Sequence, residues 1–296
     1  MYKNIVSIDC GATKMSYTKI YHNRKGRKHY NIAFWKKIST PVFKSYDEMV
    51  KFVAGTLPSK IDVLFIAVTG PVDEKKGVVY GGPNQFLVGP YPLKEKLSKA
   101  LDIPVFVYND VKLASEGEAR YWRNLDNFLF VMAGTGIAVE LVFNKKVVSR
   151  QNAGLGEIGH CNIGSNLRCN CGRKGCLETI SSGWAIERIT KLSDISKKKD
   201  LLSLLVNQKK YGKKFLIDLE KIWAKILEPI LLSVPVSAIV TNGSIGLHPV
   251  FQDILRNCLR NIYKRHPLLE HAQVYKSKLG WKSVPCGVIK LLQEKG

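Results

Sequence analysis

Two stretches of the sequence, one in each half of the chain, have the same outline. NIVSIDCGAT at 4–13 and NFLFVMAGTG at 127–136 each consist of an apolar strand that runs into a turn rich in glycine and threonine, followed by another strand-like run. A supersecondary unit that recurs at a long offset is typical of a duplicated domain. We therefore expect two related lobes, which meet across a cleft because no linker rich in Ser and Pro separates them.

Strand-like and helix-like segments alternate after each copy. Apolar runs predict strands at 63–70, 105–110 and 237–243, and amphipathic patterns predict helices at 92–101, 111–122, 183–232 and 249–264, before a final strand and helix. This alternation indicates an α/β protein with a mainly parallel or mixed sheet. We predict an N-terminal α/β lobe over residues 1–118, to which a C-terminal helix at 284–296 returns, and a C-terminal lobe over residues 119–283.

The segment GHCNIGSNLRCNCGRKGCLE at 159–178 holds one histidine and four of the seven cysteines. One imidazole and three thiolates suffice for a closed tetrahedral zinc site. The predicted ligands are His160, Cys169, Cys171 and Cys176. A DNA-binding finger has its cysteines before a helix and its histidines on it, whereas here the order is reversed and glycines interrupt the loop. We predict a structural zinc clip, with Cys161 as an alternative ligand and a reduced, metal-free cluster as the other possibility.

The two glycine turns offer groups that bind phosphate. In the first, Asp9 ends a buried strand and is followed by Gly11, Thr13 and Lys14, which supply N–H groups, a hydroxyl and an ammonium. Asp9 is also suited to hold Mg²⁺ through water. The second turn contains Gly134, Thr135 and Gly136. Either turn alone is compatible with an ordinary hairpin, but two of them in repeated lobes favour a nucleotide clamp.

The chain carries 46 Lys and Arg against 24 Asp and Glu, a formal net charge of +22. The positive charge is diffuse, and its densest parts are a predicted hairpin tip at 22–29 and a Lys-rich region at 191–214. We interpret it as solvated surface with weak, non-specific attraction to nucleic acid. The sequence begins without the pattern of a secretory signal, and its longest apolar stretch is too short to span a bilayer, so we expect a soluble cytoplasmic protein with no membrane partner.

Four separated motifs resemble the ROK family of sugar kinases and transcriptional repressors, within the actin, hexokinase and Hsp70 fold group. The motifs are IDCGATK at 8–14, TGPVD at 69–73, YNDVKLASEGEARY at 108–121, and GEIGH followed by CNCGRKGCLETISSG up to residue 183. The resemblance implies a duplicated, two-lobed actin-like ATPase (ribonuclease H-like) fold. It also implies ATP-dependent phosphorylation of a hexose or N-acylhexosamine at its 6-hydroxyl, as in a glucokinase. We expect a homodimer or homotetramer.

The resemblance also assigns roles to individual residues. Asp110 would be the catalytic base, the two glycine turns would hold ATP, and a set of polar residues would hold sugar hydroxyls: Asn109, Asp110, Glu157, His160 and Glu178. Asn84, in the segment GGPNQF, is a further candidate for the sugar. A carboxylate at the end of a strand can orient a sugar hydroxyl and take its proton. The alternatives are a helix N-cap for Asp110, a turn residue for Asn84, and surface charge for Glu157 and Glu178.

The sequence departs from the family pattern near both predicted substrates. Lys112 stands where the family commonly has Asn, and Ala138, Val139 and Glu140 follow the second turn in place of further glycine. These departures support a sugar-binding protein without catalysis as the alternative function. Repressors of the family carry an added helix-turn-helix segment before the first phosphate motif, and Asp9 lies so near the start of this sequence that we expect none. The sugar itself is not predicted.

Overall fold

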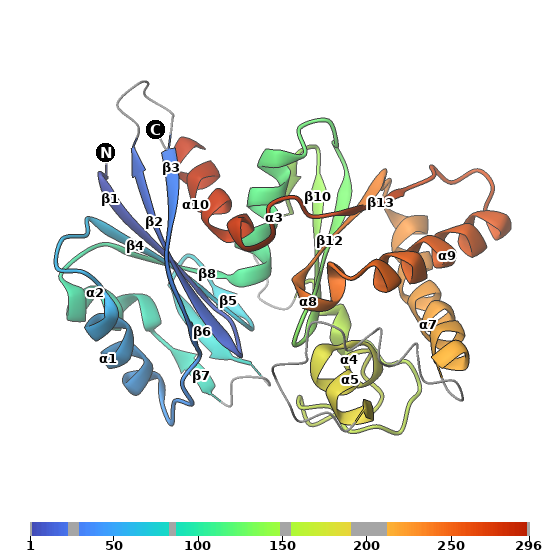
Figure 1. The fold of residues 1–296 in the computed structure, drawn as a ribbon, viewed down its shortest axis with the longest axis horizontal. Helices are drawn as coiled ribbons and strands as arrows, with labels where there is room; N and C mark the ends of the chain where they lie inside the picture. The colour runs from blue at the N-terminus through green and yellow to red at the C-terminus, as the bar shows by residue number, and fades with distance from the viewer. Residues whose placement is uncertain (1, 23–29, 83–86, 149–154, 191–211, 295–296) are drawn as a thin grey trace. The chain divides into compact units, whose positions relative to one another are not determined.

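The structure, a computed structural model, describes residues 2–22, 30–82, 87–148, 155–190 and 212–294 (Figure 1). It divides into two compact units. The first unit comprises Met1–Trp122, Ser149–Leu155 and Trp281–Gly296, and the second comprises Arg123–Val148 and Gly156–Gly280. The lobe boundaries predicted at 118/119 and 283/284 lie a few residues from these divisions. Asn84, most of the hairpin tip predicted at 22–29 and most of the Lys-rich region at 191–214 lie outside the described residues.

The first unit is built on a five-stranded sheet. Its strands are β1 (Asn4–Cys10), β2 (Lys14–His22), β3 (Tyr30–Ser39), β4 (Val63–Val68) and β8 (Val105–Asn109), in the order β3-β2-β1-β4-β8. β1, β2 and β3 are antiparallel neighbours, whereas β1, β4 and β8 are parallel. All six residues of β4 are buried, as expected for a parallel strand covered on both faces.

Helices cover the two faces of this sheet (Figure 1). α1 (Tyr46–Thr56) and α2 (Leu93–Leu101) share a buried cluster with one set of alternating strand residues. α1 begins where Ser45 Oγ accepts a hydrogen bond from Glu48 N at 3.2 Å, the usual arrangement of an N-cap. A small antiparallel sheet joins β5 (Val72–Asp73), β6 (Val78–Gly81) and β7 (Val88–Tyr91).

α3 (Asp110–Tyr121) and α10 (Ser283–Glu294) pack against each other within the first unit (Figure 1). Two glycines allow the close crossing: a Cβ on Gly117 would lie 2.0 Å from Ser283 O, and one on Gly287 would lie 1.9 Å from Leu113 O. The buried Glu118 carboxylate accepts hydrogen bonds from Ser283 Oγ at 2.7 Å and Trp122 Nε1 at 2.9 Å. Helix α3 is therefore held along its length by the C-terminal helix.

The second unit repeats the sheet. Its strands are β9 (Phe128–Ala133), β10 (Ile137–Phe143), β11 (Lys146–Val147), β12 (Ala238–Asn242) and β13 (Gln273–Lys276), in the order β11-β10-β9-β12-β13. β9, β10 and β11 are antiparallel neighbours, and β9, β12 and β13 are parallel. The central strand and its partners thus follow the pattern of the first unit, which confirms the predicted α/β class and duplication.

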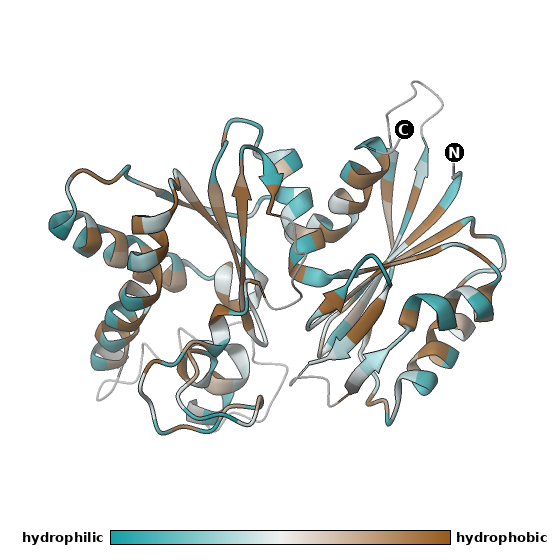
Figure 2. Cartoon of the chain, turned by 180° about the vertical axis from the view of Figure 1, so that it is seen from behind, coloured by the Kyte–Doolittle hydropathy of each residue, from teal (hydrophilic) through white to brown (hydrophobic). Residues whose placement is uncertain are grey.

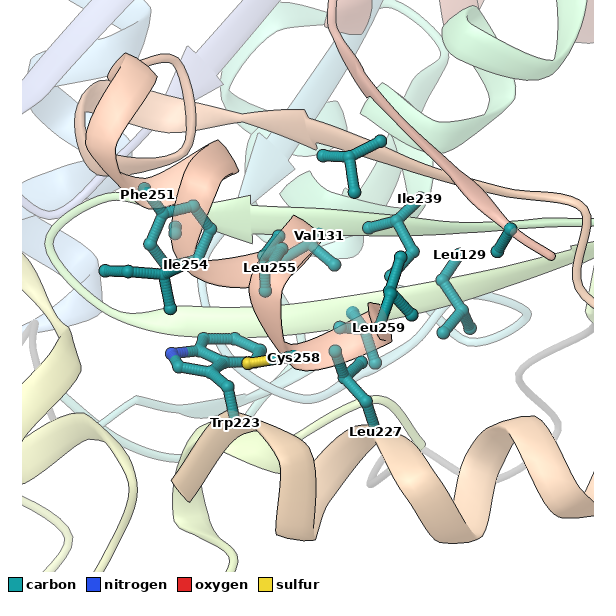
Figure 3. Packing of buried hydrophobic residues seen from close by; sticks show 14 of the residues in the cluster. Leu129, Val131, Trp223, Leu227, Ile239, Phe251, Ile254, Leu255, Cys258 and Leu259 are labelled. Carbon is teal, nitrogen blue, oxygen red and sulfur yellow. The ribbon is translucent and has the colours of Figure 1, made fainter. Parts of the chain in front are cut away.

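The core of the second unit lies between this sheet and two long helices, α7 (Gly212–Ser233) and α9 (Pro249–Arg265). α9 buries Phe251, Ile254, Leu255, Cys258, Leu259 and Ile262, an i, i+3, i+4, i+7 stripe. Trp223 of α7 meets Phe251 edge to face at 5.3 Å (Figure 3). Figure 2 shows apolar residues concentrated on the strands and both polar and apolar residues on the helices. Among the described helices, none has the length and apolar character needed to span a bilayer.

Between β11 and α7 the described chain forms a loop with three short helices, η1 (Ile158–His160), α4 (Glu178–Ser181) and α5 (Gly183–Thr190). A hydrogen bond from Trp223 Nε1 to Ser181 Oγ, 2.8 Å long, ties α4 to the core. A further short helix, α8 (Gly243–Gly246), follows β12. The region predicted as helix at 183–232 therefore corresponds to α5 and α7 in its described parts.

Candidate active site

In the first unit, two carboxylates lie at the same edge of the sheet. Asp9 is near the carboxyl end of β1, and Asp110 follows the carboxyl end of β8. Because β1, β4 and β8 are parallel, these ends meet at one edge, where α/β sheets bind ligands. Both carboxylates are close enough to the buried Cys10 thiol to influence it: burial raises the pKa of Cys10 most, and the charges of Asp9 and Asp110 raise it further. The structure therefore brings these two predicted site residues together.

Asn109, not Asp110, is the N-cap of α3. Asn109 Oδ1 accepts a hydrogen bond from Lys112 N at 3.0 Å, and its Nδ2 donates to Gly70 O at 2.9 Å. Asp110 is the first helical residue, and its Oδ1 accepts a hydrogen bond from Val111 N at 2.9 Å. The alternative that Asp110 serves as the N-cap is therefore wrong, and the predicted strand 105–110 ends one residue earlier, at Asn109.

The first glycine turn is closed by its own backbone. Gly11 N donates to Lys14 O at 3.0 Å, and Thr40 bonds the carbonyls of Gly11 and Thr13 at 2.7 and 3.1 Å. The side chains of Thr13 and Lys14 are exposed. Burial raises the pKa of Asp9 to about 6, although Lys37 opposes the shift. The turn is thus a rigid hairpin with an exposed hydroxyl and ammonium beside a poorly hydrated carboxylate.

The second glycine turn, in the second unit, is surrounded by backbone. Gly134 N donates to Gly136 O at 2.9 Å, and Gly183 N donates to Gly134 O at 2.8 Å. A Cβ on Gly243, whose φ is +89°, would lie 2.3 Å from Ala133 O. Only glycine fits so close to a neighbouring carbonyl at a positive φ. The turn therefore meets the starts of α5 and α8.

Glu178 is a buried link between the cysteine-rich loop and this turn. Its side chain is 3% exposed, its Oε1 accepts a hydrogen bond from Ile137 N at 2.8 Å, and its Oε2 accepts one from Trp184 Nε1 at 3.3 Å. Ile137 is the first residue after the AGTG turn. The alternative that Glu178 is surface charge is therefore wrong. Glu157 precedes η1 and is partly buried.

The four predicted metal ligands come together in the second unit. The ligand atoms of His160, Cys169, Cys171 and Cys176 all lie within 4.8 Å of one another. Cys171 Sγ and Cys176 Sγ are 3.6 Å apart, close to the ~3.8 Å that zinc–sulfur bonds of about 2.3 Å give in a tetrahedron. His160 Nδ1 faces Cys169 Sγ at 3.7 Å, which leaves Nε2 on the other side of the ring. Cys161 is exposed and outside the group.

Tight turns bring these ligands into reach of one another. Cys169 N donates to Arg173 O at 2.8 Å, and Gly172 N donates to Cys169 O at 3.0 Å. Gly172 and Gly175 have φ values of 87° and 84°, a region that costs other residues strain. The glycines that interrupt the loop in sequence are thus the residues that let it fold back on itself.

The departures from the family pattern occupy buried or partly buried positions in the structure. Lys112 Nζ forms an ion pair with Glu74 Oε2 at 2.5 Å, and Glu140 lies buried in β10. Glu74 was not among the predicted site residues, because nothing in its local sequence shows that it meets Lys112. The only available signal was Lys112 itself, since a cation on the inner side of a helix requires a partner.

The sequence model of the ROK family matches residues 5–295. The chain belongs to the ROK family. This confirms the resemblance carried by the four motifs, and the fold agrees. Structural similarity covers 99% of this chain and 100% of a ROK family glucokinase from Streptomyces griseus, solved in complex with glucose and AMPPNP, with a TM-score of 0.73 and 22% identity.

Two curated relatives are kinases of different sugars. The glucokinase of Halalkalibacterium halodurans is 34% identical over 153 residues, a match that spans 48% of this chain and 45% of that protein. The N-acetylmannosamine kinase of Haemophilus influenzae is 23% identical over 282 residues, which cover 93% of this chain and 90% of that protein. The first match is closer but spans only about half of each chain, whereas the second runs through nearly all of both.

Proposed function

We propose that this protein transfers the γ-phosphate of ATP to the 6-hydroxyl of a hexose or N-acylhexosamine, with Asp110 as the general base. The broader class, a sugar kinase, rests on membership of the ROK family and on the two kinase relatives. Their names make glucose and N-acetylmannosamine the first acceptors to test.

The observation that supports Asp110 most directly is the cap of α3. Asn109 accepts the hydrogen bond of the N-cap, so the Asp110 carboxylate is not needed for that purpose. It lies instead at the carboxyl edge of the sheet that also carries Asp9. As the sugar oxygen attacks the γ-phosphorus and ADP leaves, the hydroxyl proton would pass to Asp110.

Each unit contributes residues suited to the nucleotide. In the first unit we assign Gly11, Thr13 and Lys14 to phosphate oxygens and Asp9 to Mg²⁺, held through water. Magnesium neutralises charge on the transferred phosphate. In the second unit we assign Gly134, Thr135 and Gly136 to the nucleotide, because the turn is made of small residues and the neighbours packed closest to it, Gly183 and Gly243, have no side chains.

Sugar hydroxyls are assigned to Asn109, Glu157, His160 and Glu178, with Asn84 outside the described residues. Asn109 and Glu178 already bond protein groups, but an amide and a carboxylate each have further donor or acceptor positions. His160 turns Nδ1 to the cysteines, so Nε2 is available to donate to a hydroxyl.

The cysteine cluster fits structural zinc. Three thiolates and one imidazole at these separations match a closed tetrahedral site with no open position. Bound zinc would supply a cross-link here and no chemistry on the substrate. The protein residues that it would fix include His160 itself and, through Cys176, Glu178 at the start of α4.

The direct test is an assay of ADP release with ATP, Mg²⁺ and a panel that includes glucose, mannose, N-acetylglucosamine and N-acetylmannosamine. We expect one acceptor to be turned over at a rate in the ordinary enzyme range of about 1–10³ s⁻¹. Calorimetry with the same sugars is the companion measurement. If the protein binds a sugar but releases no ADP above the blank, the proposed kinase activity is wrong and the protein is a non-catalytic sugar-binding protein.

A further inference from the structure

Lys112 and Glu74 form an ion pair with little access to water. Lys112 lies in the first turn of α3, two residues after Asp110, and Glu74 follows β5. Lys112 Nζ and Glu74 Oε2 are 2.5 Å apart, and the two side chains are 14% and 13% exposed. Removing one charge of such a pair is destabilising, because the other charge is then left poorly hydrated and without compensation.

A second bond ties the same two segments together. Asn109 Nδ2 donates to Gly70 O at 2.9 Å. The stretch from Gly70 to Glu74 is therefore bonded to the residue before Asp110 and to the residue two positions after it. Asp110 lies between two fixed points, which restricts the direction in which its carboxylate can project.

We propose that Glu74 is a positioning residue for Asp110: by holding Lys112 it fixes the first turn of α3 and balances the charge of the lysine in that turn. The proposal rests on the proposed function. It explains how this chain accommodates a lysine where the family pattern commonly has asparagine. Lys112 brings a positive charge to the turn that carries the base, and Glu74 supplies the opposite charge.

The same helix offers a matched control pair. Glu116 of α3, one turn beyond Lys112, is paired with Lys290 of α10, and the two side chains are 10% and 14% exposed. Breaking this pair removes charge compensation at a similar degree of burial, and Lys290 keeps a second, more exposed partner in Glu294 at 3.8 Å. The pair lies farther along α3 from Asp110 and belongs to neither the proposed catalytic nor the proposed binding residues.

The experiment compares neutral variants of the two pairs in the full chain. The test set is Glu74→Gln, Lys112→Gln and their double variant, and the control set is Glu116→Gln, Lys290→Gln and their double variant. We expect both sets to lower the midpoint of thermal unfolding, but only the Glu74 and Lys112 single variants to lower kcat by about tenfold or more, with little change in the calorimetric sugar affinity. The Glu74–Lys112 double variant should recover most of the lost kcat, because a neutral pair leaves no unpaired charge.

A second readout does not depend on catalysis. The titration of the Asp110 carboxyl can be followed by carbon-13 NMR in aspartate-labelled protein and assigned with Asp110→Asn. Glu74→Gln leaves an uncompensated cation and should lower the pKa of Asp110, whereas Lys112→Gln leaves an uncompensated anion and should raise it. The other charged or titratable groups around this turn include Asp9 and Cys10 of β1, Lys37 of β3, Tyr108 of β8, Glu116 of α3, and Lys290 and Glu294 of α10.

Shifts of the Asp110 pKa in opposite directions in Glu74→Gln and Lys112→Gln, larger than those in the control variants, would support the positioning role. A contact that only stabilises the fold predicts no opposite shifts of this pKa. Equal effects of the two pairs on kcat, or shifts of the same sign, would overturn it. If the wild-type protein phosphorylates none of the sugars, the proposed function fails, and the Asp110 titration alone then decides the role of Glu74.

Discussion

The two units have five-stranded sheets of the same topology, and they differ in the turn that follows the central strand of each sheet. In each, the strands on one side of the central strand pair antiparallel with their neighbours, and the strands on the other side pair parallel. Each turn contains a backbone hydrogen bond of its own, but the turn after β1 is accompanied by the carboxylates Asp9 and Asp110. The turn after β9 has glycine backbone around it, from Gly183 and Gly243, with Glu178 bonded just beyond it.

This difference indicates that the duplication supplied one scaffold for two kinds of chemistry. Side-chain carboxylates suit proton transfer and metal binding, which the proposed function assigns to the first unit. Bare backbone suits close contact with phosphate and nucleoside, which it assigns in part to the second. Four substitutions test whether the two units divide the work in this way.

The largest expected effect is that of Asp110→Asn in the first unit. The amide keeps the size of the side chain but cannot accept the proton, so turnover should fall by roughly 10²- to 10⁴-fold. Sugar affinity, measured by calorimetry in the same variant, should persist. If Asp110→Asn turns over at the wild-type rate, Asp110 is not the general base. If the variant loses sugar affinity but keeps its maximal rate, Asp110 is a binding residue.

Next comes Cys171→Ser in the second unit, with Cys161→Ser as the matched control. We expect purified wild-type protein to contain about one zinc per chain and Cys171→Ser much less, with turnover lowered by about tenfold or more. Cys161 is exposed and outside the cluster, so Cys161→Ser should keep the zinc content and the turnover of the wild type. Full activity in zinc-free protein would show that turnover does not depend on a metal in the cysteine cluster.

Gly243→Ala should have a smaller effect, confined to the nucleotide. Its Cβ would lie 2.3 Å from Ala133 O at a φ of +89°, and relieving strain of about 1–3 kcal/mol would displace the second turn. We expect nucleotide affinity, from titration with a fluorescent ATP analogue, to fall by about tenfold and sugar affinity to hold. Gly164→Ala has a similar φ of +81° with nothing near its Cβ and should bind nucleotide normally.

The smallest effect is one of pH on stability through Asp9. Burial raises the pKa of Asp9 to about 6 in the folded chain, so the folded state binds this proton more tightly than the unfolded state. The free energy of unfolding attributable to Asp9 therefore decreases as pH rises from about 4 to 6. Asp9→Asn removes the destabilising ionisation of Asp9 and should be more stable than wild type at pH 7 by about 3 kcal/mol, and by much less at pH 4.

Urea unfolding at the two pH values, without Mg²⁺ or nucleotide, measures this difference. Asn144→Asp places an ionisable group near the surface of the second unit and serves as the control, since it should show no such dependence. A variant Asp9→Asn that is less stable than wild type at pH 7 would mean that the ionised carboxylate has compensating partners.

Short motifs and periodicity were sufficient for the frame of the protein. The apolar run at 63–68, the stripe on 249–265 and the turns at 11–13 and 134–136 each lie within one element or one connection. Their local patterns therefore predict them. The grouping of His160, Cys169, Cys171 and Cys176 was predictable for the same reason, because four side chains within one loop can meet by folding that loop alone. β3, α1 and the small sheet around β6 were not predicted, since their patterns are irregular: β3 has no clear alternation of buried and exposed residues.

The sequence by itself determined the α/β class, the duplication, the family and the residue types available for chemistry, because these depend on motifs that are read along the chain. Only the tertiary structure decided which polar side chain does what. Asn109 caps α3 in place of Asp110, Glu178 bonds the strand after the second turn, and Glu74 meets Lys112. The last two depend on partners 41 and 38 residues apart in the chain. No local pattern encodes such partners, because burial and proximity arise only when the strands and helices have packed.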